Sequence, residues 1–93
     1  MTRTSAKKLI ISGKVQGVYF RLETQKAALQ AGVDGYVKNL PDGSVEAVLQ
    51  GPSQAVDQMV AWCRQGPPAA RVDQVIEGTL PAPTDFNGFE IRY

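Results

Sequence analysis

The order of helical and extended segments is the feature of this sequence that most limits how the chain can fold. Two segments have helical spacing, and strand-like segments lie on both sides of each. We predict strands over residues 7–13, 33–40, 44–50, 71–78 and 88–93, and helices over residues 21–31 and from an N-cap at Ser53 to a stop at Gly66. This order predicts an α+β fold, the ferredoxin-like βαββαβ plait, in which two helices cover one face of an antiparallel sheet.

Each predicted helix has one side that is suited to the core. In the first helix these residues are Leu22, Gln25, Ala28 and Leu29. In the second helix they are Val56, Met59, Val60 and Cys63, at the i, i+3, i+4, i+7 spacing of an amphipathic helix. In the first strand Leu9 and Ile11 point to one face and Ile10 to the other, which suits a strand near the middle of the sheet.

The predicted topology brings two distant polar residues together. The first and second strands run in the same direction, so the loop 14–20 and Asn39 lie at the same edge of the sheet. In the usual strand order, 4-1-3-2, the third strand lies between the first and second strands and separates them by about 10 Å. Arg21, in the first turn of the first helix, therefore faces the same mouth as Asn39, and the gap holds one phosphate-sized anion and a water.

The loop 13-GKVQGVYFR-21 places positive charge at a helix N-terminus, where the main chain already carries partial positive charge. Gly13 and Gly17 allow backbone conformations that other residues avoid, so that successive N–H groups can curl into an anion-binding nest. Without a ligand, Arg21 is unfavourable by up to ~1 kcal/mol. With a phosphate bound, its planar guanidinium can hold two oxygens at once. We therefore predict an anion site.

Composition excludes several kinds of chemistry. The 93 residues are expected to form one domain, 1–93, with residues 1–6 as a flexible tail. Histidine is absent and Cys63 is the single cysteine, which argues against an imidazole base, an internal disulfide and a zinc site. A net charge of +1 provides no field that would attract nucleic acid or a membrane surface, and no segment resembles a membrane span or a secretory signal. We expect a cytoplasmic monomer with no metal, cofactor, nucleic-acid or membrane partner.

Four motifs of the sequence resemble those of the acylphosphatase family. They are 13-GKVQGVYFR-21 with Thr24, 35-GYVKN-39, 42-DGSVE-46 and 88-GFEIRY-93, and together they extend the resemblance over residues 7–93. The resemblance implies a small cytosolic hydrolase that cleaves acyl phosphates, which are carboxyl-phosphate mixed anhydrides, to carboxylate and inorganic phosphate. Tyr36 and Lys38 stand where tryptophan and arginine are commoner in the family, and Leu40 stands where threonine is frequent.

The resemblance also implies the site. The two catalytic residues would be Arg21, which binds the phosphate, and Asn39, which orients the attacking water. The phosphate-binding residues would be Gln16, Gly17, Val18, Tyr19, Phe20 and Arg21, the loop residues acting through their main-chain amides. Inorganic phosphate or sulfate would bind at the same place. A carboxylate leaving group, with a pKa of about 4, needs no general acid, so neither metal nor histidine is required.

Other interpretations of the same residues stay open at this point. Arg21 is compatible with a surface role in which it solvates the helix start, and Asn39 with shaping the turn before Pro41. The loop would also suit a non-catalytic anion sensor or interaction module. RNA-recognition modules share the plait, but they stack bases on aromatic residues of the central strands, where this chain has aliphatic residues such as Leu9 and Val45.

Overall fold

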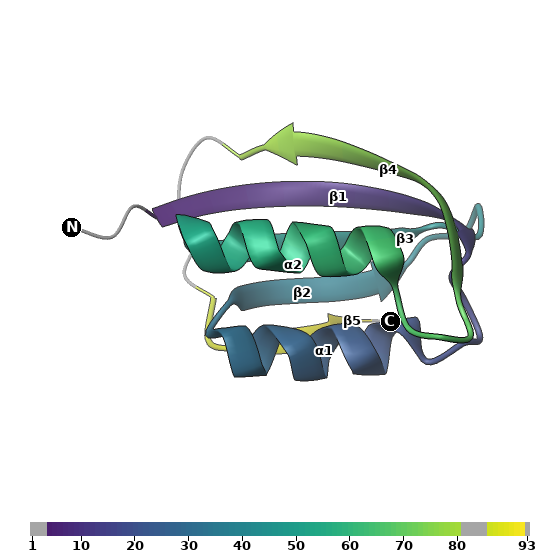
Figure 1. Ribbon diagram of the computed structural model, residues 1–93, viewed down its shortest axis with the longest axis horizontal. Helices are drawn as coiled ribbons and strands as arrows, with labels where there is room; N and C mark the ends of the chain where they lie inside the picture. The colour runs from purple at the N-terminus through teal and green to yellow at the C-terminus, as the bar shows by residue number, and fades with distance from the viewer. Residues whose placement is uncertain (1–3, 81–85, 93) are drawn as a thin grey trace.

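An open five-stranded sheet with two helices on one face forms the fold of the computed structural model, which describes residues 4–80 and 86–92 (Figure 1). The elements are β1 (Thr4–Lys14), α1 (Phe20–Ala31), β2 (Asp34–Asn39), β3 (Val45–Pro52), α2 (Ser53–Gln65), β4 (Arg71–Thr79) and β5 (Phe89–Arg92). The strand order is β4-β1-β3-β2-β5. The predicted ferredoxin-like plait, with the third strand between the first and second, is confirmed.

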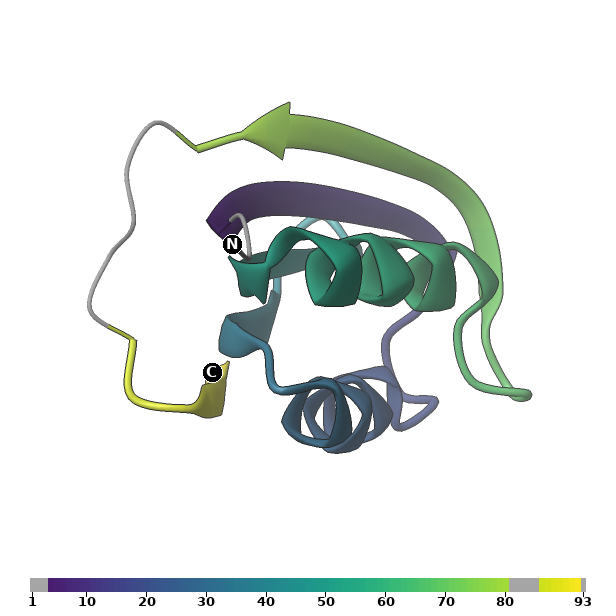
Figure 2. The same ribbon diagram turned by 60° about the vertical axis from the view of Figure 1, so that its left-hand side comes forward.

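Two details of the sheet differ from the prediction. The closing strand β5 pairs in parallel with β2, with Gly35 opposite Phe89, so the sheet is mixed rather than antiparallel. Both β2 and β5 start at the end of the sheet at which β4 finishes, so they run in the same direction (Figure 1). Figure 2 shows β4 and β5 at opposite edges of the sheet. In addition, β1 begins at Thr4, which pairs with Pro52. Residues 4–6 therefore belong to the sheet and not to the expected tail, and residues 1–3 lie outside the described residues.

The core lies between the sheet and the two helices. Leu9 and Ile11, which were predicted to share one face of the first strand, are fully buried. The corresponding residues of the other strands are fully buried too: Val37, Val45, Ala47 and Leu49. On α2 the predicted stripe of Val56, Met59, Val60 and Cys63 is buried throughout. Burial raises the pKa of the Cys63 thiol to about 12, so this cysteine is a packing residue with an unreactive thiol at neutral pH.

The core-facing side of α1 was predicted only in part. Its buried residues are Phe20, Thr24 and Ala28, whereas Leu22 and Leu29 are 43% and 58% exposed. The helix begins one residue earlier than predicted, and the Phe20 ring packs edge-on against Trp62 with 5.8 Å between ring centroids. Phe20 is thus the first residue of the buried stripe, and Leu22 lies outside that stripe. Ser53 is the first residue of α2 and not its N-cap, a position that Pro52 occupies.

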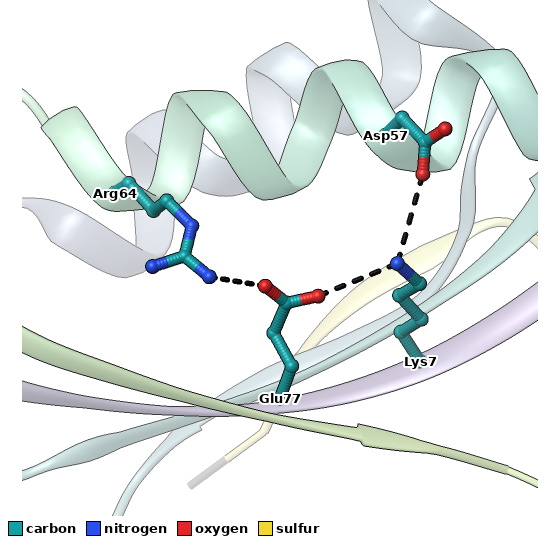
Figure 3. Close-up of polar contacts among 4 residues, drawn as sticks. All are labelled: Lys7, Asp57, Arg64 and Glu77. Carbon is teal, nitrogen blue, oxygen red and sulfur yellow. Dashed lines mark hydrogen bonds and ion pairs between the residues drawn. The ribbon is translucent and has the colours of Figure 1, made fainter.

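A charged cluster connects the edge strand β4 to α2 (Figure 3). Glu77 of β4 accepts hydrogen bonds from Arg64 of α2 and from Lys7 of β1, and Lys7 lies 3.7 Å from Asp57 of α2. The hydrogen bonds from Arg64 and Lys7 lower the pKa of Glu77, which therefore stays ionised. Pairing with β1 places β4 at the edge of the sheet farthest from β5, and the cluster adds contacts between β4 and α2. No helix within the described residues is long and apolar enough to cross a membrane.

Candidate active site

A pocket of about 440 Å³ opens at the sheet edge where β1 and β2 end. It is lined by Val15, Gly17, Tyr19, Phe20, Arg21, Leu22, Asn39 and Ile91. In Figure 1 this edge is on the right, where the loop after β1, the arrowhead of β2 and the end of β5 come together. Arg21 and Asn39, which are far apart in the sequence, thus line one pocket, as the topology predicted.

The loop between β1 and α1 contains two residues in the left-handed region of backbone conformation. Gly17 has a φ of 74°, and Tyr19 has a φ of 61° and a ψ of 22°, so two left-handed residues flank Val18. A bulky residue rarely adopts this conformation, which costs about 1–3 kcal/mol and is found mostly at functional sites. Val15 and Val18 bury their side chains in the core and so fix the loop in place.

The start of α1 offers main-chain donors to the same pocket. Tyr19 is the N-cap residue, and its side chain makes no capping hydrogen bond. The first helical bond runs from the Glu23 N–H to the Tyr19 carbonyl at 3.0 Å, which leaves the preceding N–H groups without a carbonyl from within the helix. Such a helix start binds anions well, because its N–H groups and its dipole both favour negative charge.

The guanidinium of Arg21, which lines the pocket, forms a hydrogen bond to the last strand, β5. Its Nη1 donates to the carbonyl oxygen of Arg92 at 3.5 Å, a long hydrogen bond that connects α1 to β5. A guanidinium carries five donors in a planar fork, so this contact is compatible with two-point binding of an anion. The contribution of β5 to the site, through Arg92 and through Ile91 in the pocket lining, was not predicted. The sequence indicated that a closing strand exists, but not that this strand pairs with β2 and so reaches the pocket.

Asn39 is the last residue of β2, opposite Val45 of β3. Its side-chain oxygen, Oδ1, is buried and has no hydrogen-bond partner among the described residues. Most buried polar atoms have such a partner, and an exception requires an explanation. Asn39 also lines the pocket that contains Arg21, so its carboxamide suits a bound water or ligand group at that place.

Gln16 has a role in the structure that the sequence did not indicate. Its side-chain amide nitrogen, Nε2, donates to the carbonyl oxygens of Leu40 and Ser44, each at 2.8 Å. These carbonyls belong to the turn that directly follows Asn39. The side chain of Gln16 therefore links the loop to this turn, in addition to the main-chain amide that the prediction assigned to phosphate binding.

The nearby carboxylates have partners of their own. Ser44 donates to Asp42 from both its main-chain N–H and its hydroxyl, which lowers the pKa of Asp42. Glu46 accepts hydrogen bonds from Tyr36 at 2.8 Å and from Lys8 at 3.1 Å. Burial alone would raise the pKa of Glu46, but these two donors lower it overall. Neither carboxylate lines the pocket.

The residues that depart from the family pattern lie outside the pocket lining as well. The Tyr36 ring is covered by the Arg92 guanidinium, 4.0 Å from its centroid, and burial raises the pKa of its phenol, assisted by the hydrogen bond to Glu46. Tyr36, Lys38 and Leu40 are absent from the lining residues. The departures therefore leave the polar groups of the pocket in place.

The fold and the pocket define a small α+β plait domain whose polar side chains converge at one edge of the sheet. The family model described as acylphosphatase matches residues 7–91. Acylphosphatases from Gloeobacter violaceus and Rubrobacter xylanophilus are 62% and 49% identical to the chain, covering 87% and 97% of it and 86% and 82% of the relatives.

Solved structures agree with these sequence matches. The acylphosphatase from Bacillus subtilis superposes with a TM-score of 0.92 at 31% identity, covering 96% of this chain and 99% of that one. The acylphosphatase from Coxiella burnetii gives a TM-score of 0.90 at 35% identity, covering 96% and 93%. The chain therefore belongs to the acylphosphatase family. The predicted enzyme class, a hydrolase that acts on acid anhydrides, is confirmed.

Proposed function

We propose that the protein hydrolyses acyl phosphates to carboxylate and inorganic phosphate at the pocket between the β1–α1 loop and the end of β2. The assignment of residues rests on two observations: Oδ1 of Asn39 is buried without a hydrogen-bond partner among the described residues, and Asn39 and Arg21 line one pocket. The proposal extends to a cytoplasmic monomer that needs neither metal nor cofactor.

The phosphoryl group binds to the nest and to Arg21. The main-chain amides from Gln16 to Phe20, together with the first N–H groups of α1, surround its oxygens, and the Arg21 guanidinium holds two of them. Charge on these oxygens is stabilised by donors that the fold already holds in position, as in an oxyanion hole. Inorganic phosphate and sulfate carry the same oxygens and bind at the same place.

Asn39 positions the water that attacks phosphorus. Its Oδ1 accepts a hydrogen bond from this water and directs it towards the side of the phosphoryl group opposite the leaving carboxylate. The P–O bond to the acyl group breaks as the bond to water forms, and the carboxylate leaves without protonation. An amide cannot act as a base near neutral pH, so the proton of the water passes to an oxygen of the phosphate.

Turnover of benzoyl phosphate in the presence of EDTA tests the proposal. We expect steady hydrolysis by the wild-type protein, whereas an anion sensor would bind phosphate without turnover. Arg21→Lys should lose most of the activity, because an ammonium group cannot reproduce a two-point grip. Asn39→Ala should lower kcat by about 100-fold, the cost of a misplaced nucleophile. Wild-type kcat in Asn39→Ala would show that this residue does not position the water.

A further inference from the structure

We propose that Gln16 is a positioning residue, whose side chain holds the turn after Asn39 in register with the phosphate-binding loop. This inference rests on the proposed function, because it assigns to Gln16 the alignment of the two halves of that site. The phosphoryl group would be bound by the loop and the water by Asn39, so their relative position decides the geometry of attack.

The contacts of Gln16 connect these two halves directly. Nε2 donates both of its hydrogens, one to the carbonyl of Leu40 and one to the carbonyl of Ser44, at 2.8 Å each. Leu40 follows Asn39 in the chain, and Ser44 precedes Val45, the residue that pairs with Asn39 in the sheet. A single side chain from the loop is thus bonded to main-chain groups on both sides of the position that Asn39 occupies.

The turn does not need Gln16 to satisfy its own hydrogen bonds. The Leu40 carbonyl also accepts from the Gly43 N–H at 3.2 Å, and the Ser44 carbonyl accepts from the Leu40 N–H at 2.9 Å. Removing the Gln16 amide therefore leaves neither carbonyl without a donor, so the cost to the fold is small. What is lost is the connection between the loop and the turn, which indicates a role in alignment rather than in turn formation.

Asn39 needs such support because its own side chain does not provide it. Its Oδ1 has no partner among the described residues, so this atom does not fix the side chain against the loop. The alignment must come from the main chain around it. Gln16, which is half-buried and anchored between the buried residues Val15 and Val18, provides a rigid attachment from the loop.

A double-mutant cycle with benzoyl phosphate tests the proposal. Gln16→Met keeps the length of the side chain and removes its donors, and should lower kcat by about 10- to 100-fold. Inhibition by inorganic phosphate should be nearly unchanged, since Arg21 and the loop amides remain. In the Asn39→Ala background, Gln16→Met should change kcat by no more than about twofold, because no positioned water is left to misalign. Gln30→Met, an exposed glutamine of α1, is the matched control and should behave as wild type.

Each other outcome of the cycle overturns the proposal. Equal losses of kcat in the two backgrounds would show that Gln16 acts independently of Asn39, and failure of Gln16→Met to fold would make it a requirement of the fold. Wild-type kcat in Gln16→Met would show that the contact has no role in the reaction. Wild-type activity of Asn39→Ala alone would instead refute the proposed role of Asn39, which the cycle detects separately.

A second variant gives an independent readout. Gln16→Glu keeps the length of the side chain, but its ionised carboxylate has no hydrogen to donate, whereas the protonated form has one. The kcat of this variant, relative to wild type, should therefore rise as the pH falls through the range in which the carboxyl group becomes protonated. A ratio that stays constant with pH would contradict a role based on hydrogen-bond donation.

Discussion

Asn39→Ala should lower activity without lowering stability, because the structure buries the side-chain oxygen of Asn39 without a hydrogen-bond partner among the described residues. A buried acceptor without a donor costs about 1–3 kcal/mol, and Oδ1 of Asn39 has no donor among the described residues. Replacing the side chain by a methyl group removes this cost, so the free energy of unfolding should stay the same or rise by up to about 2 kcal/mol.

Urea denaturation followed by Trp62 fluorescence measures this effect. The midpoint of Asn39→Ala should equal or exceed that of wild type at an unchanged m-value, and a gain of 1 kcal/mol would raise Tm by roughly 4–8 °C. Asn87→Ala, which removes the same group from an exposed position outside the pocket lining, is the control and should leave both stability and kcat unchanged. A loss of more than about 1 kcal/mol in Asn39→Ala would show that the Asn39 side chain stabilises the folded protein, contrary to this prediction.

Three further predictions concern stability. Gly13→Ala should cost at least about 2 kcal/mol in urea denaturation, because Gly13 has a φ of 128° at a bulge in β1 and a Cβ there would collide with the Arg71 carbonyl; an unchanged midpoint would contradict this. Thr24→Val should cost about 1 kcal/mol, since it removes the buried 2.6 Å hydrogen bond to the Phe20 carbonyl, and a stabilised variant would contradict that value. The pKa of Glu46 is lowered in the folded protein, so Glu46 contributes stability that is present above its unfolded pKa of 4.5 and is lost as the pH falls through its folded pKa. The free energy of unfolding of Glu46→Gln should therefore depend less on pH below about 5 than that of wild type. The same pH dependence in both proteins would contradict this prediction.

The sequence predicted those parts of the fold that depend on local pattern and on chain topology. The α2 stripe has four apolar residues at helical spacing, and all four are buried. The meeting of Arg21 and Asn39 at one pocket followed from the direction of the strands, because two strands on either side of a third end at the same edge. Neither inference required knowledge of side-chain packing.

The parts that were missed depend on contacts between distant segments. Leu22 and Leu29 fit the period of a core-facing stripe, but both are exposed in the structure. The helix instead buries the side on which Phe20 packs against Trp62. β5 pairs with β2 at the edge of the sheet opposite to β4, and a four-residue strand has no local sequence pattern that identifies its partner strand. The reach of Gln16 across to the turn at 40–44 depends on a side-chain conformation, which the sequence does not encode in any local pattern.

The proposed site can be tested with a crystal of the protein soaked in orthophosphate. We predict phosphate at the N-terminus of α1, with its oxygens bonded to the loop amides and to two nitrogens of Arg21, and a water between the phosphorus and Oδ1 of Asn39. An empty pocket at saturating phosphate, or a phosphate bound elsewhere with Arg21 and Asn39 turned away from it, would show that the proposed site is wrong.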